Sequence, residues 1–439
     1  MAKNKMNKNL YAIIGYIVLC IVLIGFLAAV FVGAYLEKSD LVTDPVLAKA
    51  LSEYFDKKPR NLTQEDLDSV AYLDFSASNT ITIGDLEAYN SYKEEGNLGD
   101  DIVDVSIASD FENIEAVFAQ LRGLKHLDFS GGNIVIDSAA QLSKLTGLER
   151  LGLNNTKLTS YAELSTLTAL KELQLVSAPI TDASFLKSLT ALENLDISGT
   201  GVKDLSVLSG LTSLTTLFAD ENEISDVTPL AGLTKLENVS LQDNKITSLS
   251  TLSALTAMVS LNVSNNDLGD LAGLETMTKM ENLSFVGNEV TSLAPLSQMT
   301  SLTSLTADQN KLVDLAGVPA EKISSLSANE NEIADISAVE KMTALISLSL
   351  SDNKITDVKA LAALKKLTTL NLQENEIKKA EDLKTLEKLK TLQLTGNPVE
   401  DIKTLDDLKK GGCTITFEEE KTESEDKNED TAEDDTAAE

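Results

Sequence analysis

The 439-residue sequence has few of the residue types that most catalytic and binding sites use. It contains one histidine, no tryptophan and two cysteines, and aromatic residues make up only 4% of it. Histidine is the usual acid or base near neutral pH, and tryptophan is a frequent interface anchor. Cys20 and Cys413 lie far apart, which indicates neither a disulfide framework nor a cysteine metal site. We therefore expect no enzyme, no metal site and no cofactor.

Basic residues are also scarce. The chain has 37 lysines and arginines against 69 aspartates and glutamates, a net charge of -32. Binding to DNA or RNA depends on positive charge that releases counterions from the phosphates. The charge therefore argues against a nucleic-acid partner.

The longest apolar run is the uncharged segment 10–36. As a helix it would span roughly 40 Å at 1.5 Å per residue, enough to cross a bilayer. Three lysines lie in the basic N-terminus 1–9, and acidic residues follow in the linker 37–43 and just beyond it. By the positive-inside rule the N-terminus is cytoplasmic and the remainder extracellular. We predict a single-pass signal-anchor in the cell membrane.

Two alternatives remain for this segment. A cleaved signal peptide would end near Ala34, but its apolar core would be unusually long. A lipoprotein signal would lipidate Cys20, but Leu19 precedes it where a small residue is required. The small residues in this run, Gly25, Ala29 and Gly33, are common in spanning helices generally. A weak homodimer through their four-residue spacing is the second interpretation.

A helical cap is expected at 44–69. An Asp-Pro pair favours a first helix, and Thr63 with Asp66 forms an acidic variant of the capping box for a second. Leu62 can pack on Leu67 as a hydrophobic staple. A cap is required because the first coil of a solenoid would otherwise expose its core and an unpaired strand edge.

The region 70–410 is a tandem repeat. A first strand is predicted at 72–75, followed by an irregular polar insertion at about 79–101 that we expect to be the least ordered part. Steps of 22 residues dominate afterwards, and Gly317 lies in the one shortened 21-residue step. The leading apolar residue recurs at Leu124, Leu148, Leu170, Leu192, Leu214, Leu236, Met258, Met280, Leu302, Ile323, Leu345, Leu367 and Leu389.

Positions 1, 4 and 6 of each coil are apolar and alternate, as expected for inward residues of a parallel strand. Position 9 is asparagine in nine successive coils: Asn222, Asn244, Asn266, Asn288, Asn310, Asn331, Asn353, Asn375 and Asn397. A buried amide can donate and accept, so it can satisfy the backbone where the chain leaves the sheet. We predict a structural asparagine ladder. Earlier coils have other residues at this position, which predicts that the N-terminal coils are less stable.

Position 13 is frequently aspartate, which can cap a short helical turn on the back of the coil. One carboxylate per coil, without neighbouring oxygen ligands, is a poor calcium site. These residues are Asp182, Asp204, Asp226, Asp270, Asp314, Asp335, Asp357 and Asp401.

The end of the chain divides into two parts. Residues 411–417 are predicted to form a closing strand over the last core layer, with Cys413 buried and inert. Residues 418–439 contain twelve acidic and two basic residues and few apolar ones, a composition typical of a disordered tail.

The repeat, most plainly at 211–230, resembles the internalin-like leucine-rich repeats of Gram-positive bacteria over residues 44–417. The template itself predicts an α/β, right-handed leucine-rich-repeat solenoid. Its parallel sheet would form the concave face, and short 3-10 or irregular turns the convex face. The resemblance implies protein binding through the concave strands, and some family members are adhesins for host receptors. The chain departs from the family in having no immunoglobulin-like domain and no Leu-Pro-x-Thr-Gly sorting motif, so covalent display on the wall is not expected.

The outward strand positions are small, polar and nearly uncharged, with Phe218 as their one aromatic from the Leu148 coil onward. His126 has no readable carboxylate or serine partner, so catalysis there is not expected. Candidate binding residues are Phe218, Val176, Gln174, Asp196, Ser240, Asn262, Val259, Val286, Thr306 and Ile346.

The favoured function is a membrane-anchored protein that binds another protein in the cell envelope. The alternatives are a secreted or surface adhesin and a structural spacer without a ligand.

Overall fold

The computed structural model describes residues 51–52, 55, 57–75, 80–95, 103–106, 118–130 and 138–417. Several predictions concern residues outside the described ranges. They are the anchor 10–36 with its flanking segments and Cys20, most of the first cap helix, and the acidic tail 418–439. Across the described ranges, no helix is both long and apolar enough to cross a membrane.

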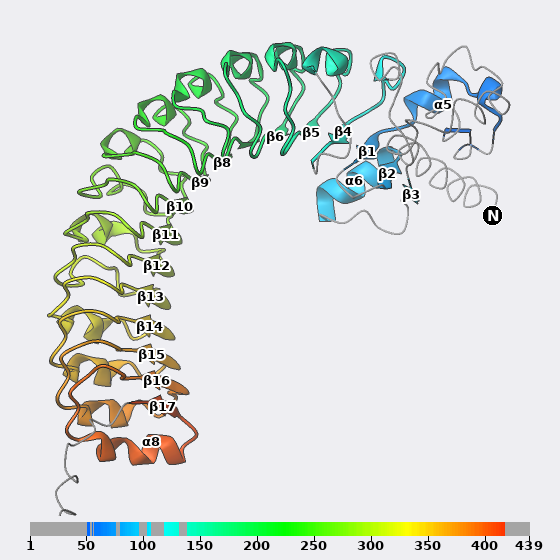
Figure 1. Cartoon of the computed structure of the whole chain (residues 1–439). Helices are drawn as coiled ribbons and strands as arrows, with labels where there is room; N and C mark the ends of the chain where they lie inside the picture. The colour runs from blue at the N-terminus through cyan, green and yellow to red at the C-terminus, as the bar shows by residue number, and fades with distance from the viewer. Residues whose placement is uncertain are drawn as a thin grey trace, which may run out of the picture.

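The described strands form one curved sheet of 17 strands (Figure 1). Each strand from β4 onward is parallel to the next and in register with it. The strands of this parallel run are β4 (His126–Asp128), β5 (Arg150–Gly152), β6 (Glu172–Gln174), β7 (Asn194–Asp196), β8 (Thr216–Phe218), β9 (Asn238–Ser240), β10 (Ser260–Asn262), β11 (Asn282–Ser284), β12 (Ser304–Thr306), β13 (Ser325–Ser327), β14 (Ser347–Ser349), β15 (Thr369–Asn371), β16 (Thr391–Gln393) and β17 (Thr414–Thr416).

Short 3-10 helices form the outer side of the arc (Figure 1). The predicted solenoid, with strands on the concave face and short turns on the convex face, is therefore confirmed. The helices are η3 (Ala139–Leu142), η4 (Ala162–Thr166), η5 (Ser184–Ser188), η6 (Leu205–Leu208), η7 (Thr228–Leu230), η8 (Ser250–Leu252), η9 (Ala294–Gln298), η10 (Ser337–Lys341), η11 (Lys359–Ala363), η12 (Glu381–Thr385) and η13 (Ile402–Leu405).

Two coils turn without a 3-10 helix, between β10 and β11 and between β12 and β13. Each contains a glycine with positive φ, Gly273 at +100° and Gly317 at +103°. A Cβ at Gly317 would lie 2.3 Å from the carbonyl oxygen of Leu293 in the preceding coil. Only glycine allows the coils to approach so closely, and Gly317 lies in the shortened repeat.

The inward positions of the coils form one continuous core. Leu236, Val239 and Leu241 are each at most 4% exposed, as are their counterparts in most coils. Burying apolar area stabilises the fold by roughly 25 cal/mol per Å². Because each coil packs only on its neighbours, this burial is the main force that holds successive coils together.

The position-9 asparagines connect each coil to the one before it. The Asn244 amide nitrogen donates to the carbonyl oxygens of Ala219 and Leu241, at 2.9 and 3.0 Å. Its oxygen accepts from the Ile224 N–H at 2.9 Å. Equivalent bonds recur through Asn397, which donates to Leu372 and accepts from Ile377.

The N-terminal cap contains α5 (Gln64–Asp68). The Thr63 hydroxyl accepts from the Asp66 N–H, and the Asp66 carboxylate accepts from the Thr63 N–H. Leu62 and Leu67 are both buried in the core. The predicted capping box is confirmed, and the burial of the two leucines agrees with the predicted staple.

The expectation of an irregular insertion at about 79–101 is wrong for residues 80–95. Those residues, together with 103–106 just beyond the predicted insertion, have regular secondary structure. They form β2 (Thr80–Gly84), α6 (Leu86–Glu95) and β3 (Val103–Ser106). β2 pairs antiparallel with β1 (Tyr72–Asp74) and with β3, while β1 pairs in parallel with β4. The physical reason is the unpaired edge of β1, which the β-branched residues of β2 cover. α6 lies on the inner side of the arc (Figure 1).

The C-terminal end closes as predicted. After η13, the helix α8 (Asp406–Lys410), which the sequence analysis did not predict, leads into β17. β17 pairs with β16, so that Thr391 is opposite Thr414. Cys413 is buried, and burial raises the pKa of its thiol.

Candidate functional site

The concave surface consists of the first and third residues of each strand, because the middle residue points into the core. The third residues form a continuous row in register: Gln174 is opposite Asp196, Asp196 opposite Phe218 and Phe218 opposite Ser240. The row continues through Asn262 and, further along, Thr306. Six of the ten candidate binding residues therefore share one row.

The other four candidates do not belong to this row. Val176 and Val286 are half-buried and lie after their strands, whereas Val259 and Ile346 lie before theirs. Ile346 is 49% exposed but lies six strands from Phe218. These apolar residues are scattered and do not form one patch.

Phe218 is the largest exposed apolar side chain on the described concave strands, with 40% of its surface exposed. It borders a hollow of about 200 Å³ that is also lined by Glu172, Gln174, Asn194, Asp196 and Thr216. Pockets for small molecules usually have volumes of ~300–1,000 Å³. The hollow is better suited to one side chain of a partner than to a cofactor.

Further along the arc, many polar side chains on the concave surface bond to the neighbouring coil. Asp220 accepts from the Ser240 hydroxyl at 2.6 Å and from the Gln242 N–H at 2.7 Å. Asp308 accepts from the Ser327 hydroxyl at 2.7 Å. These lateral hydrogen bonds reduce the number of groups available to a partner.

Charges concentrate at the N-terminal end of the concave face. The Arg150 guanidinium lies 2.5 Å from the Glu172 carboxylate and packs over the Tyr92 ring at 5.0 Å. Tyr92 and Tyr89 belong to α6 and contact Tyr72 of β1. The sequence analysis missed this arrangement, although α6 and β1 together carry three of the eight tyrosines.

His126 lies beneath these tyrosines and is only 4% exposed. Its ring stacks on Tyr72 with centroids 4.1 Å apart and meets Tyr92 edge-on at 5.3 Å. Burial lowers the pKa of His126 to about 3, so the imidazole is neutral at pH 7. Neither ring nitrogen has a hydrogen-bond partner among the described residues.

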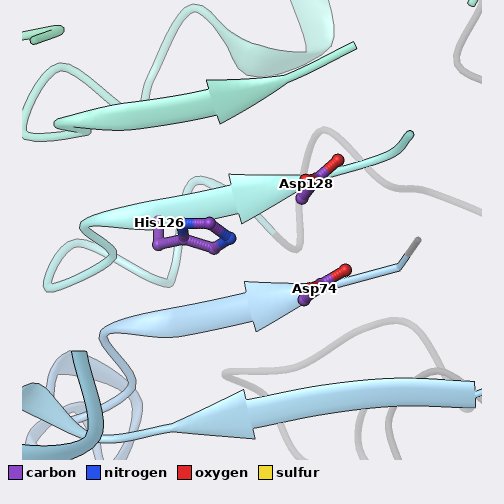
Figure 2. A group of neighbouring side chains, drawn as sticks. All are labelled: Asp74, His126 and Asp128. Carbon is purple, nitrogen blue, oxygen red and sulfur yellow. The ribbon is translucent and has the colours of Figure 1, made fainter. Parts of the chain in front are cut away.

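His126 nevertheless lies close to two carboxylates, although no described residue bonds to its ring nitrogens. Asp128 lies two residues further along β4, and β1 brings Asp74 directly opposite Asp128 (Figure 2). One potential ligand atom from each of the three residues lies within 4.8 Å of the others. The sequence itself indicates Asp128, because it lies two residues after His126 and therefore on the same face of the strand. Asp74 could be found only through the strand pairing.

Seven of the eight position-13 aspartates accept a hydrogen bond from the N–H two residues later, at the start of the convex turn. Of these seven, only Asp204 is the N-cap residue of a 3-10 helix. Asp204 accepts from the Ser206 N–H at 2.7 Å, and Asp182, Asp226, Asp270, Asp314, Asp335 and Asp357 make the same i to i+2 bond. Asp401 is different, because it accepts from the Ala380 and Glu381 N–H groups of the preceding coil.

Comparisons with known proteins agree with the fold. A family model described as "Leucine Rich repeats (2 copies)" matches residues 365–410. The chain is 28% identical to the internalin InlF of Listeria monocytogenes, with a TM-score of 0.65, covering 82% of this chain and 95% of that one. The comparison with curated proteins found no match.

Two further structures show likeness of fold alone. The functional domain of InlJ from Listeria monocytogenes is 22% identical, with a TM-score of 0.59, covering 83% of this chain and 76% of that chain. A leucine-rich-repeat protein of Leptospira interrogans is 22% identical, with a TM-score of 0.54, covering 69% of this chain and 80% of its own. By its repeat architecture and its similarity to InlF, the chain has a leucine-rich-repeat fold and resembles the internalins.

Proposed function

We propose that the protein binds another protein of the bacterial cell envelope through the concave face around Phe218, while segment 10–36 anchors it in the membrane. The observation that carries the proposal is the exposed Phe218 ring beside a hollow of side-chain size. Exposed aromatic residues next to small depressions are typical hot spots of protein interfaces.

The residues around Phe218 indicate which side chains a partner would place against this surface. Glu172 and Asp196 line the same hollow, and the chain as a whole is strongly acidic. Glu172 already pairs with Arg150, whereas Asp196 accepts from the Ser198 N–H. A partner loop with an apolar residue flanked by basic groups would complement this surface in shape and charge.

The proposed location follows from the length of the solenoid and of the linker that joins it to the membrane segment. Seventeen strands spaced by ~4.8 Å make a sheet of roughly 80 Å along its path, and the proposed linker 37–43 is short. A body of this size, held at the membrane, favours a partner within the envelope over a distant host receptor.

The proposal is tested by site-specific photocrosslinking in intact cells. A photoreactive phenylalanine analogue replaces Phe218 in the full-length protein, and a matched variant carries it at Gln393, the third residue of the distal strand β16. We expect one envelope protein to crosslink at position 218 and not at 393. Absence of a specific product at both positions would favour the spacer interpretation.

The similarity to InlF supports a second candidate, a secreted or surface adhesin. This candidate requires cleavage near Ala34. N-terminal sequencing of the protein from cells and culture medium separates the two. A mature chain that starts near Tyr35 would overturn the anchored proposal, and an intact N-terminus in the membrane fraction would overturn the adhesin.

A further inference from the structure

Asp74, His126 and Asp128 form a compact group of potential ligands on the concave side of the first two coils. Figure 2 shows Asp74 and Asp128 side by side at the ends of β1 and β4, with the His126 ring on the same strand as Asp128. The group involves neither Phe218 nor its hollow. The binding function proposed for Phe218 therefore does not account for this group.

His126 is the first independent observation. A buried imidazole normally bonds through at least one nitrogen, because an unpaired buried polar group is costly. His126 is 4% exposed, and no described residue bonds to its Nδ1 or Nε2. The ring packs against Tyr72 and Tyr92, which hold it next to the two carboxylates. A ligand that binds the lone pair of one ring nitrogen, or accepts the proton of the other, would satisfy this group.

The paired carboxylates are the second observation. Like charges directly opposite each other on neighbouring strands repel, and Asp74 is directly opposite Asp128. Arg150 of the neighbouring strand β5 is paired with Glu172. A bound cation would remove the repulsion.

Both carboxylates are held in place. The Tyr72 hydroxyl donates to Asp74 Oδ2 at 3.2 Å, and the Ser130 N–H donates to Asp128 Oδ1 at 2.6 Å. The neighbouring strand leaves room for Asp128, since a Cβ at Gly152 would lie 2.2 Å from its Oδ1. These contacts orient the ligands before any ion binds, as in established metal sites.

We infer that Asp74, His126 and Asp128 bind one divalent transition-metal ion of the zinc class. One imidazole and two carboxylates suit such ions, whereas calcium and magnesium prefer oxygen ligands alone. Zinc bonds of about 2.0–2.2 Å place ligand atoms roughly 3.3 Å apart, so small rotations of the carboxylates from a group within 4.8 Å complete the site. Water or a partner group fills the remaining position.

The ion would join the first coil to the second. β1 provides Asp74 and β4 provides His126 and Asp128, and these coils precede the asparagine ladder that begins at Asn222. Metal binding therefore supplies a connection between coils in the part of the solenoid where asparagine does not.

The test uses the full-length protein in detergent, without a histidine tag, after removal of metal with a chelator. Zn²⁺ is titrated in competition with a chromophoric chelator, and Co²⁺ provides a visible absorption probe. The variants are Asp74→Asn and Asp128→Asn. Asp196→Asn is the matched control, because Asp196 occupies the same strand position and also accepts from the N–H two residues later.

We expect wild type and Asp196→Asn to bind one ion per chain, and each ligand variant to bind about tenfold or more weakly. Equal binding by all four proteins would overturn the site, since it would reflect the acidic surface. Displacement of Zn²⁺ by equimolar Ca²⁺ would overturn the metal class.

The single histidine gives a measurement that needs no variant. His126 is the only source of side-chain imidazole resonances in the chain. We expect one equivalent of Zn²⁺ to shift these NMR signals in wild type. Unchanged signals at saturating Zn²⁺ would overturn His126 as a ligand.

Discussion

Asn244 reaches across to the preceding coil, where its amide nitrogen lies 2.9 Å from the carbonyl oxygen of Ala219. The same side chain accepts from the Ile224 N–H and donates within its own coil to Leu241. One buried side chain thus satisfies backbone groups of two coils.

Asn244→Ala should lower the free energy of unfolding by about 2–4 kcal/mol, because several buried backbone groups lose their partners. Urea denaturation followed by circular dichroism measures the change. Asn238→Ala, on the solvent-facing side of β9, is the control and should change stability by less than about 0.5 kcal/mol. Equal effects would contradict the role of the ladder.

The N-terminal coils should open more readily than the later ones. At the ladder position Thr156 donates only to Leu153 of its own coil, and Ala178 has no polar side-chain atom. Amide hydrogen exchange resolved by mass spectrometry should show weaker protection from β5 to β6 than from β9 to β16. Uniform protection along the solenoid would refute this expectation.

Asp66→Asn should cost about 1 kcal/mol at pH 7, because the Asp66 carboxylate completes the capping box with Thr63 and pairs with Lys57. Burial opposes ionisation of Asp66, but hydrogen bonds from Lys57 and Thr63 outweigh it and lower its pKa below 3.8. A lowered folded pKa means that the stabilisation is present above the unfolded value and is lost as pH falls through the folded value. The stability difference between wild type and variant, from thermal unfolding, should therefore shrink below pH 4. A constant difference down to pH 2 would contradict the assignment.

Gly317→Ala should destabilise the protein by more than about 1 kcal/mol, because its positive φ and the carbonyl of Leu293 exclude a Cβ. Gly210→Ala is the matched control, since a Cβ there meets nothing within 4 Å. Chemical denaturation of the two variants should separate them clearly. Similar stabilities would show that the β12–β13 turn tolerates side chains.

Phe218→Ala should leave stability within about 0.5 kcal/mol of wild type, because the side chain is on the surface. Its affinity for the partner captured at position 218 should fall about tenfold or more, as for an interface hot spot. Surface plasmon resonance with the purified partner measures this. Ser347→Ala, on the distal strand β14, should bind like wild type.

The repeat period alone predicted the solenoid, its inward leucines and the closing strand β17. Each coil contacts mainly its neighbours, so a 22-residue spacing sets the register of the whole sheet. The capping box at Thr63 and Asp66 was equally readable, because its contacts are local. The outward row from Gln174 to Ser240 also followed from strand alternation, although the scattered valines showed no such organisation.

Only the tertiary structure decided what covers the first coils. Residues 80–106 carry no repeat, so their sequence could not indicate that β2 pairs with β1 or that α6 lies on the concave side. His126 and Asp128 lie close in sequence. Asp74 precedes the insertion and lies beside them only because β1 pairs with β4. Periodicity determined the contacts between equivalent positions of successive coils, whereas this non-local pairing created the buried histidine and its two carboxylates.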